Sequence, residues 1–127
     1  MRLFFLILFS AFLLNSCSDD SVKQYRLEIV AEYPHDVNSY TQGLFFHKGQ
    51  MYETTGLRGE STLRIVDMET GNPLKKMDFD KKYFIEGSVV FNDNIYILTW
   101  DSKVTFAYGV DSLDYRATWK YQEKDGD

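Results

Sequence analysis

The sequence predicts an all-β protein that contains two copies of one four-stranded antiparallel unit. The first observation is a repeat: the frame at residues 40–56 recurs at 84–100, so that Gln42 falls on Glu86 at an offset of 44 residues. The second is that both copies consist of short runs rich in aromatic and β-branched residues, separated by turn residues. The third is that, after the apolar start of the chain, no apolar stretch of helix length keeps the helical i, i+3, i+4 period.

The first copy divides into four expected strands, each bounded by turn residues. Lys48–Gly49 forms the hairpin between the first two, and Asp67–Asn72 is a turn of the Asp-x-x-x-Gly type between the last two. The last strand is the most polar, as an outer edge strand should be. The expected strands are Gln42–His47, Gln50–Thr54, Thr62–Asp67 and Pro73–Phe79.

The second copy repeats this order of strands. Its expected strands are Glu86–Phe91, Ile95–Trp100, Lys103–Val110 and Asp114–Tyr121. Four antiparallel strands with the polar strand outermost are typical of a β-propeller blade. We therefore expect two blades, at about 40–79 and 84–122, of an incomplete ring. The aromatic residues assigned to the core between blades are Phe45, Tyr52, Phe91, Tyr96 and Trp119.

One further strand is expected before the first blade. Residues 25–33 alternate in part between apolar and polar side chains and are rich in aromatic and β-branched types. In a propeller, such a leading strand pairs with the last blade, and that blade is absent from the sequence. The chain also stops at Glu123–Asp127, in mid-connection. We interpret the sequence as a fragment of a longer polypeptide.

The start of the chain is typical of an export signal. Met1–Arg2 and the apolar run from Leu3 to Leu14 are too short to span a bilayer, and the single cysteine, Cys17, follows after Asn15 and Ser16. The block resembles a bacterial lipoprotein signal, which predicts residues 1–16 as signal peptide, Cys17 as the lipidated residue and 17–24 as a tether. The expected location is the bacterial cell envelope, with a lipid anchor in the membrane. The alternative is a plain signal peptide with an unrelated cysteine.

Composition excludes several classes of function. The chain has 14 basic and 19 acidic residues, a net charge of -5 and no basic cluster, so nucleic acid is not an expected partner. The only histidines, His35 and His47, fit no zinc-ligand spacing. His35 is interpreted as a loop residue and His47 as a hairpin-end residue. We predict neither a metal site nor a cofactor.

An ordered series of motifs resembles a known family. The motifs, in chain order, are Tyr33–Asp36, Tyr40–Leu44, Tyr52–Leu57, Leu63–Arg64, Val66–Asp67, Thr70–Gly71, Tyr83–Gly87 and Leu98–Trp100. Together they resemble the plant-type and bacterial glutaminyl-peptide cyclotransferases over residues 25–127, the part predicted as a partial propeller domain. The family has a five-bladed propeller, so the resemblance implies that about two of five blades are present.

The resemblance implies conversion of N-terminal glutaminyl residues of peptides or proteins to pyroglutamyl residues, with release of ammonia. Glu86 matches the catalytic glutamate of the family and is expected to act as general acid and base. Gln42, Tyr40, Phe84 and Trp100 match substrate-binding positions, although Tyr40 stands where phenylalanine is usual. Further groups of the site come from later blades. The fragment alone is therefore expected to be inactive, and the complete protein to be a monomer.

Plainer interpretations stay open beside this one. Glu86 can be an exposed carboxylate at the start of a strand, the common fate of glutamate. Gln42 can satisfy backbone at a strand end, and Phe84 and Trp100 can belong to the core between blades. For the whole protein the alternatives are a lipid-anchored propeller that binds peptide ends without turnover, and a degenerate reading frame without function.

Overall fold

A computed structural model describes residues 22–122, which contain eight β-strands and no helix. The strands are β1 (Thr41–His47), β2 (Gln50–Thr55), β3 (Thr62–Val66), β4 (Pro73–Asp78), β5 (Ile85–Phe91), β6 (Asn94–Thr99), β7 (Val104–Gly109) and β8 (Tyr115–Lys120). Each begins and ends within a few residues of an expected strand. The repeat therefore predicted both the number and the order of these strands.

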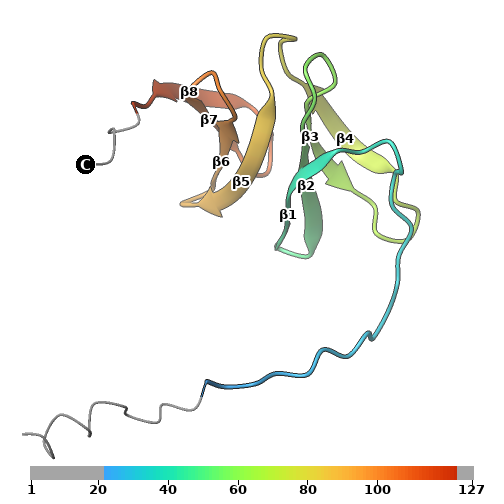
Figure 1. Ribbon diagram of the computed structural model, residues 1–127. Helices are drawn as coiled ribbons and strands as arrows, with labels where there is room; N and C mark the ends of the chain where they lie inside the picture. The colour runs from blue at the N-terminus through green and yellow to red at the C-terminus, as the bar shows by residue number, and fades with distance from the viewer. Residues whose placement is uncertain (1–21, 123–127) are drawn as a thin grey trace, which may run out of the picture. The chain divides into compact units, whose positions relative to one another are not determined.

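The strands form two four-stranded antiparallel sheets with the orders β1-β2-β3-β4 and β5-β6-β7-β8 (Figure 1). Every strand pairs with its neighbour in the sequence, as in a meander. The hairpin turn at Lys48–Gly49 uses positive φ angles of 47° and 79°, which suit a tight connection between twisted strands. The prediction of an all-β fold with two blades of an incomplete propeller is confirmed. We call β1–β4 the first blade and β5–β8 the second blade.

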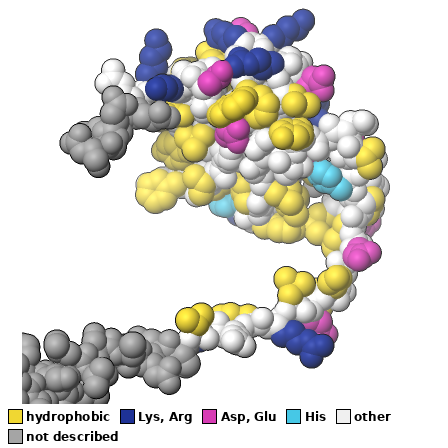
Figure 2. Space-filling view, in the orientation of Figure 1, with side chains coloured by type: hydrophobic (Ala, Val, Ile, Leu, Met, Phe, Trp, Pro, Cys, Tyr) yellow, Lys and Arg dark blue, Asp and Glu magenta, His cyan; other side chains and the backbone are white. Residues whose placement is uncertain are grey.

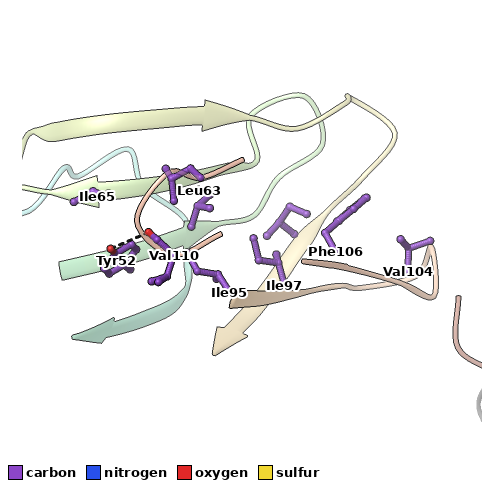
Figure 3. Close-up of a cluster of buried hydrophobic side chains, with 10 residues drawn as sticks. Tyr52, Leu63, Ile65, Ile95, Ile97, Val104, Phe106 and Val110 are labelled. Carbon is purple, nitrogen blue, oxygen red and sulfur yellow. Dashed lines mark hydrogen bonds between the residues drawn. The ribbon is translucent and has the colours of Figure 1, made fainter. Parts of the chain in front are cut away.

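The hydrophobic core lies between the two blades (Figure 3). Tyr52, Leu63 and Ile65 of the first blade pack against Ile95 and Ile97 of the second, and all five are at least 95% buried. Burying such side chains stabilises the fold by about 1.5–3 kcal/mol each. The Tyr52 hydroxyl also donates to the carbonyl of Val110 at 3.1 Å, so a polar bond crosses the same interface. The blades are therefore held as one compact body.

Strands β1 and β5 lie side by side and bring the starts of the two blades together (Figure 1). The Thr54 hydroxyl of β2 donates to the carbonyl of Glu86 on β5 at 3.0 Å and lies 3.1 Å from the Ser88 hydroxyl. Gly43 permits this close approach of β1 to β5 because it has no side chain. A Cβ built on it would lie 2.8 Å from the Ser88 backbone nitrogen. The first residues of β1 and β5 are thus fixed relative to each other.

The expected strand at residues 25–33 is not formed. Residues 22–36 have no regular secondary structure, and Tyr25, Leu27 and Val30 are each more than 85% exposed. The propensity of these residues for β structure is real, but a strand needs a partner for its backbone N–H and C=O groups. None of the eight strands of the described part pairs with this segment.

Two aromatic residues assigned to the core are exposed instead. Phe91 is 63% and Trp119 48% exposed, whereas Tyr52 is buried and Phe45 packs against the core. Period-2 alternation places Phe91 and Trp119 on the face of the second blade that points away from the first. Tyr96 stacks on Trp119 on that same face, with ring centroids 5.8 Å apart. Apolar side chains are accordingly prominent on the surface of the folded part (Figure 2).

The expected signal peptide at residues 1–16 and the expected lipidation site Cys17 lie outside the described residues. Within residues 22–122, no helix is present that could cross a membrane. The lipid anchor and the envelope location stay predictions.

Candidate functional site

Gln42 and Glu86 occupy matching irregularities at the starts of β1 and β5. The register between β1 and β2 shifts between Thr41 and Gly43, which makes Gln42 an extra residue. The register between β5 and β6 shifts in the same way between Ile85 and Ser88, so that the pair that includes Glu86 faces one residue. Such β-bulges bend a strand and redirect a side chain. The repeat therefore places one carboxylate and one amide at equivalent positions of neighbouring blades.

The two bulges are in contact. The carbonyl oxygen of Gln42 lies 3.8 Å from the point where a Cβ on Gly87 would stand, and Gly87 follows Glu86 directly. The bond from the Thr54 hydroxyl to the Glu86 carbonyl holds the second bulge to the first blade. Both Gln42 and Glu86 are partly buried. Gln42 and Glu86 therefore belong to the first residues of two strands, β1 and β5, that contact each other.

The three aromatic residues assigned to the site form one row beside the bulges. The Tyr40 and Phe84 rings meet edge to face with centroids 6.1 Å apart, and the Phe84 and Trp100 rings do so at 5.3 Å. Edge-to-face pairs of this kind contribute about 0.5–1.5 kcal/mol beyond area burial. Phe84 is partly buried, while Tyr40 and Trp100 are more than half exposed. The row therefore presents flat apolar surface to solvent.

A glycine makes room for the middle ring of this row. A Cβ on Gly56 would lie 2.5 Å from Cε1 of Phe84 and 3.2 Å from Cγ of Gln42. Both side chains therefore lie directly over this glycine. Gly56 is also the repeat equivalent of Trp100, and each donates its N–H across the first hairpin, to the carbonyls of Tyr40 and Phe84 respectively. At this repeat position the second blade has the ring of Trp100, and the first blade has a glycine that leaves room for the Phe84 ring.

A buried polar network behind Gln42 was missed at the level of sequence. Glu53, in the middle of β2, is 1% exposed. Its Oε1 accepts the Thr41 hydroxyl at 2.6 Å and lies 3.0 Å from Nε2 of His35. Its Oε2 lies 3.9 Å from Nη1 of Arg64. The expected loop residue His35 is in a loop, and it has this specific partner. The signal available in the sequence was the repeat itself, in which the charged residue Glu53 aligns with the apolar residue Ile97.

Arg64 extends the network into the loop before β1. Its Nη1 donates to the Ser39 hydroxyl at 2.6 Å and to Oδ2 of Asp36 at 3.0 Å, and its Nε donates to the Thr62 hydroxyl at 2.8 Å. The Asn38 backbone N–H, and next the Arg64 guanidinium, lower the pKa of the Asp36 carboxyl. Asp36 is therefore held in its charged form below its usual titration range.

The site combines one carboxylate and one amide, in neighbouring bulges, with flat rings that lie next to the amide. Within residues 22–122, no three His, Cys, Asp or Glu side chains gather as metal ligands would. A carboxylate in such a place can accept a proton and return it to a second atom of a bound molecule. The rings can hold the apolar part of a small side chain, and the amide of Gln42 can both donate and accept a hydrogen bond.

Comparison with known proteins gives a consistent result. A family model described as glutamine cyclotransferase matches residues 3–126. A glutaminyl-peptide cyclotransferase of Arabidopsis thaliana is 36% identical over 115 residues, which are 88% of this chain and 35% of that protein. The crystal structure of Myxococcus xanthus glutaminyl cyclase is similar with a TM-score of 0.67 and 31% identity, over 76% of this chain and 40% of that one.

The chain spans 35% and 40% of the lengths of these two relatives. The family match, by contrast, covers nearly all of the chain. The sequence similarity and the two-blade fold agree with it. The chain belongs to the glutamine cyclotransferase family.

Proposed function

We propose that the protein is a glutaminyl-peptide cyclotransferase that acts on N-terminal glutaminyl residues of peptides, with Glu86 as its general acid and base. The observation that supports the proposal is the contact between the starts of β1 and β5, where the bulges that contain Gln42 and Glu86 are neighbours and the Gln42 side chain and the Phe84 ring both lie over Gly56. Membership of the family supplies the reaction class.

The reaction needs one proton to move between two nitrogen atoms. The α-amine of the substrate attacks the γ-amide carbon, a carbon–nitrogen bond forms, and the five-membered lactam closes. The Glu86 carboxylate takes the proton that the amine loses and gives it to the departing amide nitrogen. The old carbon–nitrogen bond then breaks and ammonia leaves. One carboxyl group serves both steps, because the two nitrogens are attached to the same carbon in the intermediate.

The remaining residues of the site bind the substrate in this proposal. The rings of Phe84 and Trp100 flank the methylene groups of the glutaminyl side chain, and Tyr40 extends the same wall. Gln42 hydrogen-bonds the polar atoms of the substrate that lie next to Glu86. Holding the side chain folded over its own amine brings the reacting atoms close, which lowers the entropic part of the barrier.

The proposal is tested by direct assay. The purified protein, at the length that its gene encodes, is incubated with a peptide that begins with glutamine and with its N-acetylated form. We expect release of ammonia and loss of the corresponding mass from the first peptide only, because the acetylated amine is a poor nucleophile. Binding of the first peptide without loss of ammonia would contradict the proposal and favour a binding module.

Gly56 gives a prediction about this wall. Replacing Gly56 by Ala places a methyl group 2.5 Å from Cε1 of Phe84, and the ring must turn aside because the methyl cannot. We expect the KM for a glutaminyl peptide to rise about tenfold, the effect of about 1.4 kcal/mol of lost binding. The melting temperature should change little, since the Phe84 ring is only partly buried and a side chain can move more easily than backbone. An unchanged KM would show that the Phe84 ring does not contact the substrate.

A further inference from the structure

The two blades fix their bulges by different means. In the second blade the residue before the bulge is Ile85, which is fully buried in the core and is held by packing. Its repeat equivalent Thr41 is exposed and has no such packing. The Thr41 hydroxyl instead donates to Glu53 at 2.6 Å, a short bond to a charged acceptor. The first bulge is therefore anchored by a polar contact.

Glu53 is costly to bury, and the repeat offers an apolar alternative. Its equivalent Ile97 is fully buried in the second blade. A charge in the interior needs partners to offset the loss of hydration. Glu53 has three of them, in Thr41, His35 and Arg64. Two of these three belong to the segment that precedes Gln42, which is the segment that Glu53 can hold in place.

Arg64, on β3, completes the polar contacts around Glu53, and we call this set of contacts the clamp. It pairs with Glu53 across the β2–β3 register, and its guanidinium bonds Asp36 and Ser39. In the second blade its equivalent is Tyr108, so the whole clamp is particular to the first blade. Loop residues on both sides of residue 37 are thus tied to β2 and β3. The segment enters β1 with Tyr40 and Gln42 at defined positions.

We propose that Glu53 is a positioning residue for the site, acting through Thr41 to hold Gln42 and Tyr40 against Phe84. The inference rests on the proposed function for its kinetic consequence. Its structural part concerns only the contacts between Glu53, Thr41 and the residues next to Thr41. Glu53 itself touches no reacting atom in this scheme.

The test compares two variants that each lose one hydroxyl group of the first blade. Thr41→Val removes the contact to Glu53 and keeps the shape of the side chain. Tyr52→Phe removes a hydroxyl group that donates to the neutral Val110 carbonyl, on the opposite face of β2. We expect Thr41→Val to raise the KM for a glutaminyl peptide about tenfold, as the loss of one charge-assisted hydrogen bond would. Tyr52→Phe should lower the melting temperature and leave KM unchanged.

Hydrogen exchange gives a readout that needs no activity. The Gly56 N–H bonds the Tyr40 carbonyl, so its exchange reports whether Tyr40 is held. We expect exchange at Gly56 about tenfold faster in Thr41→Val than in the wild type, restored by Thr41→Ser and unaffected by Tyr52→Phe. Glu53→Ala should change KM less when it is made in the Thr41→Val variant than when it is made in the wild type. The reason is that both substitutions remove the same contact, between Thr41 and Glu53.

The outcomes separate the two proposals. If the wild-type protein releases no ammonia, the proposed function fails, and exchange at Gly56 alone decides whether Glu53 holds the segment. If ammonia is released and Thr41→Val changes neither KM nor the exchange at Gly56, the positioning role is overturned. Faster exchange with an unchanged KM also overturns it.

Discussion

Replacing Glu86 by Gln should lower kcat for ammonia release by about 10²- to 10⁴-fold, the usual contribution of a general acid and base. The amide cannot take a proton from the attacking amine or give one to the departing nitrogen. Its size and shape are nearly those of the carboxyl group, so KM should change little. Turnover of the glutaminyl peptide and its equilibrium binding, measured on the same preparation, separate the two effects.

The repeat shows why this variant should fold. The equivalent position of the first blade is already a glutamine, Gln42, in a bulge of the same kind. Glu86→Gln therefore gives both blades the same residue at this point. Glu69→Gln is the matched control, since it makes the same chemical change in the exposed turn before β4 and should retain full activity. If Glu86→Gln kept more than half of the wild-type kcat, Glu86 would not be the proton carrier.

The strands and the alignment of Gln42 with Glu86 could be predicted because the sequence pattern that defines them is periodic. Alternation of side chains defines each strand, and the offset of 44 residues aligns the two bulges without reference to any contact. The assignment of Tyr40, Phe84 and Trp100 to the site came from the resemblance to the cyclotransferases, since the repeat aligns only Tyr40 with Phe84 and sets Gly56 at the position of Trp100. Local pattern is sufficient for features that each blade builds by itself.

Features that depend on what covers a face could not be predicted in this way. Alternation places Glu53 on the face of β2 opposite Tyr52, and it does not say that His35 and Arg64 meet there. Residues 25–33 have strand propensity, but propensity does not supply a partner strand. Phe91 was assigned to the core on its type, and its exposure depends on which face of the second blade it occupies. In each case a contact distant in sequence decides the outcome.

Replacing Gly43 by Ala should destabilise the contact between the two blades by about 2–4 kcal/mol. The added methyl would lie 2.5 Å from the Thr54 hydroxyl oxygen and 2.8 Å from both the backbone nitrogen and the hydroxyl oxygen of Ser88. Backbone cannot turn aside as a side chain can, so β5 must move away from β1, at a cost typical of overpacking of about 1–3 kcal/mol. The bond from Thr54 to the Glu86 carbonyl is lost in the same movement, which adds about 1 kcal/mol.

The repeat provides the control for this substitution. Gly87 is the equivalent of Gly43 in the second blade, and a methyl built on it has its nearest described neighbour, the Gln42 carbonyl oxygen, at 3.8 Å. Gly87→Ala should therefore leave the free energy of unfolding within about 1 kcal/mol of the wild type. Urea unfolding of the two variants measures the difference directly. Equal midpoints would mean that β1 and β5 are not in close contact at Gly43. The contact between the bulges that contain Gln42 and Glu86 would then be wrong as well, because both depend on the approach of the same two strands.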